Sequence, residues 1–475
     1  MLKQPTVDAT RSGPVTGVSS AAELVARLDR LPGSRSIWVM VLTLALGGFF
    51  EYYDIYLTAY LSPGLIRSGV FHVGSEGMFG LPDQATFASV TFAGFFIGAS
   101  VFGSLADRFG RRAIFTYSIL WYSVATMLLA TSSTAIAVDW WRFVAGIGIG
   151  VELVTVDAYL AEIVPKAIRG RAFAITQFVC ASAVPVVAFV GWMLIPIEPM
   201  GIAGWRFVAL LGATGAIVVW WLRAKLPESP RWLSLHGKHA EAERVTAMLE
   251  ARVLADTGQP LPPPALARDE APGTSSFRDI WRPPYGRRTV ILAVFNFFQT
   301  IGVFGFGNWI PALLVSQGAS VMHSLQYSFI IAIAYPIGPL IWSNVADRFE
   351  RKWLIVCGAL GIAVFGLLFS LQASALYIIT IGVFIQLSNT LLTSTYHAYQ
   401  AELFPTRVRA RAVGFVYSMS RLSNVFTSLM IGFFLQNFGS FGVFCFIATS
   451  MVFVMISIGV FGPRTNGLSL EEVAN

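Results

Sequence analysis

Two acidic residues lie inside an apolar stretch near the N-terminus. Glu51 and Asp54 are the only charged residues of segment 36–61. They are three positions apart and therefore share one face of a helix. A carboxylate at bilayer depth costs at least about 3 kcal/mol unless it is protonated, paired or facing water. We predict that such a group takes up and releases a proton, with a fixed ion pair between helices as the alternative.

A second apolar stretch, 136–163, also contains charged residues that could serve this chemistry. Arg142 precedes Gly146, Gly148 and Gly150, which would let another helix approach closely. Glu152 lies near the middle of the stretch and could line a cavity, whereas Asp157 lies nearer its end. Either acid could instead brace a neighbouring helix, and packing alone accounts for the glycines.

Arg421 is the charged residue in the middle of segment 409–435. A polar stripe surrounds it at helical spacing, formed by Tyr417, Ser418, Asn424 and Ser428. A guanidinium binds a carboxylate through two parallel hydrogen bonds. Arg421 is therefore a candidate for binding an organic anion, unless carbonyls or an acid of the protein satisfy it.

Further polar and aromatic residues could complete a binding site. Asn296 and Gln299 in 288–316 and Asn389 in 374–403 could hydrogen-bond a ligand, and Tyr52 and Tyr53 could stack on a ring. His397 could titrate near neutral pH, but a lone histidine is more often structural. We find no nucleophile with a base and no metal-ligand spacing, so we expect no enzyme, cofactor or metal. Cys180, Cys357 and Cys445 all lie in apolar stretches.

The elements that carry these residues are predicted to be membrane helices. Hydrophobic residues make up 55% of the chain and charged residues 12%, about half the charged fraction of a soluble protein. Twelve apolar stretches could cross a bilayer of about 30 Å as helices. They are 36–61, 85–105, 113–131, 136–163, 171–195, 204–225, 288–316, 322–346, 353–371, 374–403, 409–435 and 440–462.

Two charged signatures recur at one offset. Asp107-Arg108-Phe-Gly-Arg111 returns as Asp347-Arg348-Phe-Glu-Arg351, and the run from Glu162 to Arg169 returns as Glu402 to Arg409, each 240 residues later. We predict an all-α membrane protein of two six-helix bundles related by a pseudo-two-fold axis, which is typical of alternating access. The repeated charges are candidates for a gate: Asp107, Arg111, Glu162, Arg169, Asp347, Arg351, Glu402 and Arg409.

The positions of the basic residues predict how the chain is oriented in the membrane. They occupy one set of connections between the stretches, and the opposite set holds only Arg67. The basic side is therefore cytoplasmic, with both termini. This placement explains the net charge of +7 without a nucleic-acid partner. The expected parts are a tail (1–35), two bundles (36–225 and 288–462), a linker with short helices and a proline-rich segment (226–287), and a tail (463–475).

These motifs resemble the major facilitator superfamily across the whole chain. The Asp107 signature is similar to its loop 2–3 motif. Three further motifs resemble those of the sugar-porter branch: Arg142-Phe-Val-Ala-Gly-Ile-Gly, Pro227-Glu-Ser-Pro-Arg231 and the run from Pro463 to Glu472. The resemblance implies that Asp54 lies opposite Arg142.

The chain departs from sugar porters in its candidate binding residues. Asn296-Phe-Phe-Gln299 does not match their paired-glutamine pattern, and Gly150-Val-Glu152-Leu is similar to metabolite:proton symporters, including bacterial niacin transporters. Arg421 stands where organic anion transporters have a substrate-contacting arginine. The resemblance implies a proton-coupled carrier of a small organic acid.

We therefore expect a monomeric symporter in the inner (cytoplasmic) membrane that imports a small monocarboxylate, aromatic or heterocyclic, such as nicotinate. Its partners would be the organic anion, protons and the lipid bilayer. A sugar or polyol symporter is the alternative on the same fold. A nutrient sensor without transport is the alternative of another class, although no signalling module is visible in the sequence.

Overall fold

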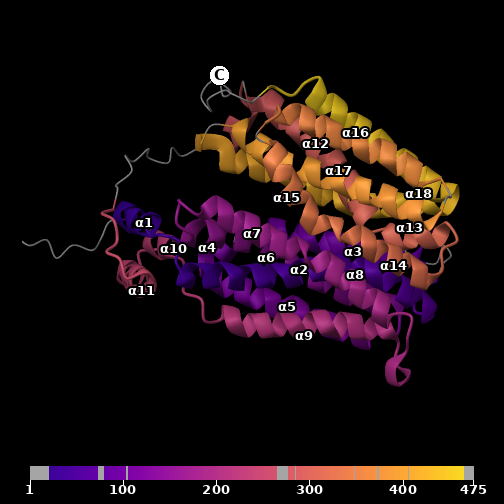
Figure 1. The fold of residues 1–475 in the computed structure, drawn as a ribbon, viewed down its shortest axis with the longest axis horizontal. Coiled ribbons are helices and arrows are strands. Elements are labelled where there is room, and N and C mark those ends of the chain that lie inside the picture. The colour runs from indigo at the N-terminus through magenta and orange to yellow at the C-terminus, as the bar shows by residue number, and fades with distance from the viewer. Residues whose placement is uncertain are drawn as a thin grey trace, which may run out of the picture.

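The computed structural model describes residues 21–72, 77, 80–102, 105–264, 276–283, 285–346, 348–371, 374–404 and 406–464. Its regular elements in these ranges are all helices, as the sequence predicted (Figure 1). Asp347, most of the proline-rich segment and the C-terminal signature beyond Arg464 lie outside the described residues.

The first half of the chain forms one group of helices. Its elements are α2 (Arg35–Arg67), α3 (Asp83–Ile97) with the π-helical η2 (Gly98–Phe102), α4 (Leu105–Phe109), α5 (Arg111–Thr131), α6 (Ala135–Ile163), α7 (Arg169–Ala181), α8 (Ala183–Leu194), η3 (Pro199–Gly201) and α9 (Gly204–Arg223). Glycines set the closest approach within this group. A Cβ on Gly94, Gly146 or Gly150 would meet the backbone of the facing helix, so α3 and α6 pack directly against each other.

The second half forms the other group. Its elements are α12 (Tyr285–Gly307), α13 (Ile310–Ser316), α14 (Val321–Ala332), α15 (Ala334–Ala346), α16 (Arg351–Phe369), α17 (Ala375–Glu402) and α18 (Thr406–Gly459). The stretches 409–435 and 440–462, predicted as separate spans, run together in α18. They meet at Gly439, whose φ of 64° is a conformation that glycine adopts without strain.

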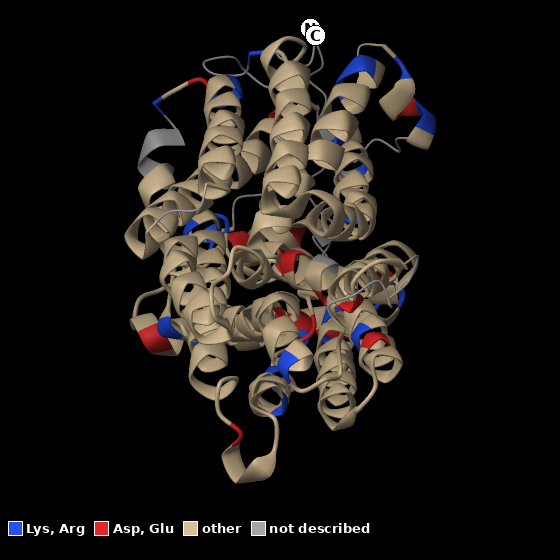
Figure 2. Cartoon of the chain, turned by 90° about the vertical axis from the view of Figure 1, so that its right-hand side faces the viewer, with Lys and Arg blue, Asp and Glu red and all other residues tan. Residues whose placement is uncertain are grey.

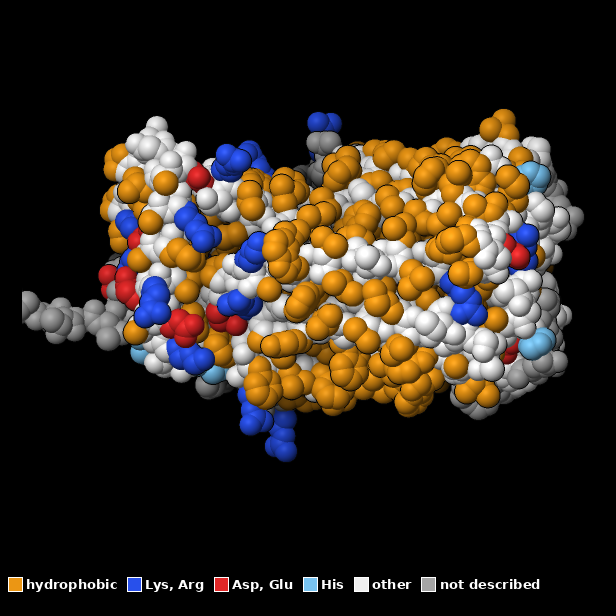
Figure 3. Space-filling model, turned by 90° about the horizontal axis from the view of Figure 1, so that it is seen from below, with side chains coloured by type: hydrophobic (Ala, Val, Ile, Leu, Met, Phe, Trp, Pro, Cys, Tyr) orange, Lys and Arg blue, Asp and Glu red, His pale blue; other side chains and the backbone are white. Residues whose placement is uncertain are grey.

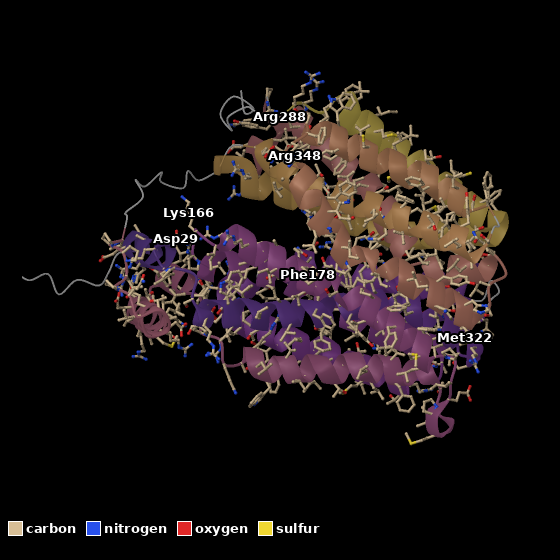
Figure 4. The ribbon with its side chains drawn as sticks, in the orientation of Figure 1. Asp29, Lys166, Phe178, Arg288, Met322 and Arg348 are labelled. Atoms are coloured by element: carbon tan, nitrogen blue, oxygen red, sulfur yellow. The ribbon has the colours of Figure 1, made fainter. Side chains whose placement is uncertain are left out.

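Eleven helices of the described residues are long and apolar enough to cross a membrane, rather than the twelve spans predicted, because α18 contains two of the predicted stretches. On the face seen in Figure 3, hydrophobic side chains form a broad belt and charged side chains gather toward the two ends. Lys166 and Arg348, from different halves, lie at one end, and Met322 lies at the other (Figure 4). The chain is a multi-pass membrane protein.

The two groups meet along a few helix pairs. α3 packs against α18, α8 against α14 and α7 against α15. Seen along the helices, acidic residues lie between the two groups as well as on the periphery (Figure 2). Charge in the middle of an apolar bundle marks the region where a polar site is to be sought.

A small helical layer covers the Lys166 end of the first half. It consists of α1 (Ala21–Asp29), α10 (Pro230–Leu235) and α11 (His239–Thr257), with η4 (Phe277–Trp281) beside α12. Arg27 and Arg30 each bind Glu250 at 2.6 Å. Burial acts to raise the pKa of Glu250, but hydrogen bonds from the two arginines hold it below its usual range. The end of the predicted tail is thus a helix that ion pairs attach to the linker.

Candidate functional site

A cavity of about 560 Å³ lies between the two groups of helices. The first group contributes Tyr52 and Tyr56 from α2, Asp157 from α6 and Gln177 from α7. The second contributes Gln299 from α12, Asn389 and His397 from α17, and Tyr417 and Arg421 from α18. Because both halves supply walls, any rotation of one half against the other would change the shape of the cavity.

Aromatic contacts between the halves close one end of this cavity. The ring centroids of Tyr56 and Tyr335 are 5.2 Å apart, and Trp192 stacks on Phe329 at 5.9 Å. On the α7–α8 side the lining runs from Phe173 to Ala181 and stops before Trp192. Phe173 lies at the start of α7, close to Lys166. The cavity therefore extends toward the Lys166 end and is closed toward the Met322 end (Figure 4).

Arg421 presents a guanidinium to the cavity without an acidic partner. Its Nη2 donates to the Tyr417 hydroxyl at 3.2 Å, and its guanidinium carbon is 4.9 Å from the centroid of that ring. No carboxylate of the described residues lies within ion-pair distance of it. Two acids of the first half, Glu51 and Asp157, act on Arg421 electrostatically, and Asp157 lines the same cavity. Most donors of Arg421 are thus free for a ligand.

Several of the other predicted binding residues also line the cavity. The amide of Asn389 has no partner on either its nitrogen or its oxygen, and the side-chain oxygen of Gln299 is likewise without one. The Tyr52 hydroxyl lies 3.5 Å from Gln177 Oε1. Buried amides usually form hydrogen bonds, so these groups are available to a ligand or to water.

Three predicted binding residues lie elsewhere. The hydroxyl of Tyr53 donates to the Val208 carbonyl of α9 at 2.9 Å. Successive residues of a helix point about 100° apart, so of these two neighbouring tyrosines only Tyr52 faces the cavity. Asn296 donates to the Leu292 carbonyl of its own helix. Asn424 is also buried, and neither asparagine belongs to the cavity wall.

Asp54 and Arg142 form a buried ion pair. Asp54 Oδ2 and Arg142 Nη1 are 2.9 Å apart, with side chains 6% and 0% exposed. Threonines complete the site: Arg142 Nε donates to Thr58 at 3.0 Å, and Thr126 donates to Asp54 Oδ1 at 3.1 Å. These threonines could not be predicted from the sequence, since a threonine in an apolar helix usually bonds its own backbone.

Glu152 pairs with Arg223, which the sequence analysis did not single out. Both side chains are fully buried, and the pair lies behind the cavity wall rather than on it. Arg223 Nη2 also donates to the Leu44 carbonyl at 2.8 Å. A Cβ on Gly47 would collide with this guanidinium, so the glycine makes room for it. Arg223 ends an apolar stretch, where a basic residue usually reflects only membrane orientation.

Glu51 is buried beside this pair. Its residue is 3% exposed, and Oε1 has no hydrogen-bond partner. The charged groups that act on it electrostatically belong to Glu152, Asp157, Arg223 and Arg421. Of these, Asp157 and Arg421 line the cavity, so Glu51 lies between the cavity and the buried pair.

The gate candidates pair within each half. Arg111 contacts Asp107 at 2.5 Å and Glu162 at 3.2 Å, and Arg351 contacts Glu402 at 2.6 Å. Arg169 binds Asp29 at 2.9 Å, and Arg409 Nε donates to the Phe404 carbonyl at 3.0 Å. Across the described ranges no ion pair joins the two halves at this end. A network between the halves remains a prediction for a state in which the cavity closes there.

The described residues hold no cluster of potential metal ligands. Outside the membrane helices, Glu228 accepts hydrogen bonds from the backbone of Arg111, at 3.0 Å, and of Arg112. Burial raises the pKa of Glu228, although these bonds oppose the rise. This carboxyl group anchors the start of α5 to the linker, which is a structural role.

Comparison with known proteins supports one family. The family model "Sugar (and other) transporter" matches residues 40–475. The "Putative metabolite transport protein YyaJ" of Bacillus subtilis is 31% identical over 93% of this chain and 95% of its own length. The "Niacin transporter NiaP" of Acinetobacter baylyi is 26% identical over 95% of this chain and 99% of its own.

Solved structures agree on the fold. A partially occluded inward-open conformation of the xylose transporter XylE from E. coli superposes with a TM-score of 0.71 at 20% identity. It covers 91% of this chain and 99% of that chain. At this identity the similarity concerns the fold alone.

Proposed function

Because the chain belongs to the sugar (and other) transporter family of the major facilitator superfamily, we propose that it is a proton-coupled symporter that imports a small organic acid. The substrate we favour is an aromatic or heterocyclic monocarboxylate such as nicotinate. The single observation that carries this choice is Arg421, which faces the cavity without an acidic partner. Arginine is costly inside a membrane and is kept there for a partner or for function.

The cavity suits such a ligand in shape as well as in charge. Arg421 would bind the carboxylate through two hydrogen bonds. The rings of Tyr52 and Tyr417 and the free amide of Asn389 offer stacking and hydrogen bonding around it. Polar groups placed within a mostly apolar pocket fix the orientation of a small ligand.

Coupling is assigned to the acids of the first half. Asp54 would accept the proton when Arg142 loosens its contact, and ionise again when the pair re-forms, with Glu51 and Glu152 in the same coupling set. A carboxylate whose arginine partner moves changes its affinity for a proton. Rocking of the two halves would then expose the cavity to each side in turn.

The proposal includes the membrane arrangement. We propose that the two arms of α18 cross the membrane separately, giving twelve crossings with both termini in the cytoplasm. The two bundles would comprise 36–225 and 288–462, joined by the linker 226–287, in a monomer of the inner membrane. The basic residues at the Lys166 end support this orientation. The described conformation would then be inward-facing.

A sugar or polyol symporter is the second candidate, and the neutral amides of Gln299, Gln386 and Asn389 on the cavity wall favour it. A thermal-stabilisation screen of the purified protein separates the two. A ligand that binds only the folded state stabilises it in proportion to the logarithm of its concentration. Nicotinate should stabilise the protein, whereas nicotinamide, which has the same ring without the carboxylate, should not. Stabilisation by xylose or a polyol alone would favour the second candidate.

The nutrient-sensor alternative predicts ligand binding without transport. It is distinguished in the same preparation by reconstituting the protein and following uptake. Binding of nicotinate without any uptake or exchange would support a sensor. Exchange of labelled for unlabelled nicotinate across the membrane would exclude it.

Replacing Glu162 by glutamine is expected to shift the protein toward inward-facing states. In the described state Glu162 pairs with Arg111 of its own half. If Glu162 also joins the halves when the cavity closes at the Lys166 end, its loss weakens that closed state more than the described one. Losing one partly exposed ion pair, worth about 1 kcal/mol, changes the ratio of states by about fivefold. A single cysteine at Thr393, on the cavity wall, should react faster with a polar reagent added from the Lys166 side.

Glu241→Gln on the surface of α11 is the control and should leave the labelling rate unchanged. An unchanged rate in Glu162→Gln, with normal labelling in the control, would show that this acid does not take part in a state-dependent gate. The introduced cysteine requires a background without Cys180, Cys357 and Cys445.

A further inference from the structure

Two carboxylates and one guanidinium are buried close to one another beside the cavity. Glu51 comes from α2, Glu152 from α6 and Arg223 from α9, and all three side chains are buried. Arg223 donates hydrogen bonds to Glu152 through Nη1 and to the Leu44 carbonyl through Nη2. One basic group therefore faces two acidic ones.

Glu51 lacks the contacts that an ionised carboxylate requires. Its Oε1 is buried without a hydrogen-bond partner, and it forms no ion pair with any described lysine or arginine. A buried charge without a partner is strongly disfavoured, and the group becomes neutral instead. A neutral Glu51 also balances the charges of these three side chains, leaving one negative and one positive charge.

Titratable groups on several helices act electrostatically on Glu51. They are Glu152 and Asp157 on α6, Arg223 on α9, Arg421 on α18, Cys180 on α7 and Tyr122 on α5. Most belong to the first half and would move with Glu51. Arg421 belongs to the second half, so it is the positive charge whose distance from Glu51 changes when the halves rock.

The Asp54–Arg142 pair is a separate proton site. It consists of one acid and one base, and Thr58 and Thr126 complete its hydrogen bonds. None of these hydrogen bonds reaches Glu51. Asp54 and Glu51 are thus buried acids in different surroundings, the first paired in this state and the second unpaired.

We propose that Glu51 binds a second transported proton, so that each cycle moves one monocarboxylate anion with two protons and a net charge of +1. This inference rests on the proposed function. An anion on Arg421 cancels the positive charge that opposes protonation of Glu51. Proton and anion therefore favour each other's binding, as reciprocal linkage requires.

The test is the response of uptake to voltage in proteoliposomes with radiolabelled nicotinate and equal pH on both sides. Symport with one proton is electroneutral, and a potassium diffusion potential cannot drive it. With two protons, an inside-negative potential of about 60 mV should give about tenfold accumulation. Protein-free liposomes correct for diffusion of the neutral acid.

Glu51→Gln should lose accumulation driven by voltage and keep accumulation driven by a pH gradient. Glutamine has the shape of a protonated glutamate, so the variant should unfold at the wild-type temperature. Glu152→Gln should also lose the voltage response, because Arg223 would then hold Glu51 as an anion. Asp139→Asn, a partly buried acid elsewhere on α6, is the control and should keep both responses.

If the wild type accumulates nicotinate under a pH gradient but not under voltage, the proposal of a second transported proton is overturned and the proposed function remains intact. A voltage response retained by Glu51→Gln, or a large loss of stability in that variant, would also overturn it. Absence of accumulation under either gradient in the wild type would overturn the proposed function and this inference together.

Discussion

Replacing Arg421 by alanine is expected to abolish binding of the organic anion. Removing one partner of a charged hydrogen-bonded pair costs on the order of 2–5 kcal/mol, which weakens binding about 30-fold or more. Lysine at this position should restore only part of the affinity, because it keeps the charge but loses the two-pronged geometry. Titration calorimetry with nicotinate on the detergent-solubilised variants measures both effects.

Arg411→Ala is the matched control, since Arg411 is an exposed arginine near the start of the same helix. It should bind nicotinate as the wild type does. A folded Arg421→Ala protein with wild-type affinity would remove the reason for choosing an anion. The sugar or polyol candidate would then take precedence.

Replacing Asp54 by asparagine is expected to abolish uphill uptake, because the transport cycle requires the proton on Asp54 even where Glu51 still binds the second one, and to leave exchange of substrate partly intact. Asparagine keeps the size of Asp54 and one acceptor oxygen for Arg142, but it cannot bind or release a proton. The accumulation ratio under a pH gradient should fall to about one, the value for passive equilibration. Uptake into proteoliposomes with an acidic exterior, measured beside counterflow exchange, separates the two activities.

Asparagine is preferable to removal of Arg142 in this test. Loss of the arginine would leave Asp54 as a buried unpaired charge and cost about 3–5 kcal/mol of stability. Proton-driven accumulation of the Asp54→Asn protein at the wild-type level would exclude Asp54 as a coupling residue, whereas Asp139→Asn should show no defect.

The helices and the repeat could be predicted because their signals are strong and local. Long apolar stretches leave few alternatives to membrane helices, and two charged signatures at one spacing define two related halves. The stretches 409–435 and 440–462 were predicted as two spans, and in the structure they meet inside α18 at Gly439.

The site was only partly predictable, because helical periodicity gives a face but not what lies opposite it. Arg421, Gln299 and Asn389 line the cavity, whereas the Tyr53 hydroxyl bonds a neighbouring helix and Asn424 is buried away from the cavity wall. Arg223 was missed because its partner Glu152 is 71 residues away in the sequence. In addition, its guanidinium has room only because Gly47 carries no side chain. Such contacts follow from packing between helices, which one sequence does not display.

The most direct test of the central claim is accumulation of radiolabelled nicotinate by the wild-type protein in proteoliposomes with an acidic exterior. The account predicts an internal concentration above that of the medium, lost when a protonophore collapses the gradient and absent from protein-free liposomes. Failure to accumulate nicotinate or benzoate, together with gradient-driven accumulation of xylose or a polyol, would contradict it.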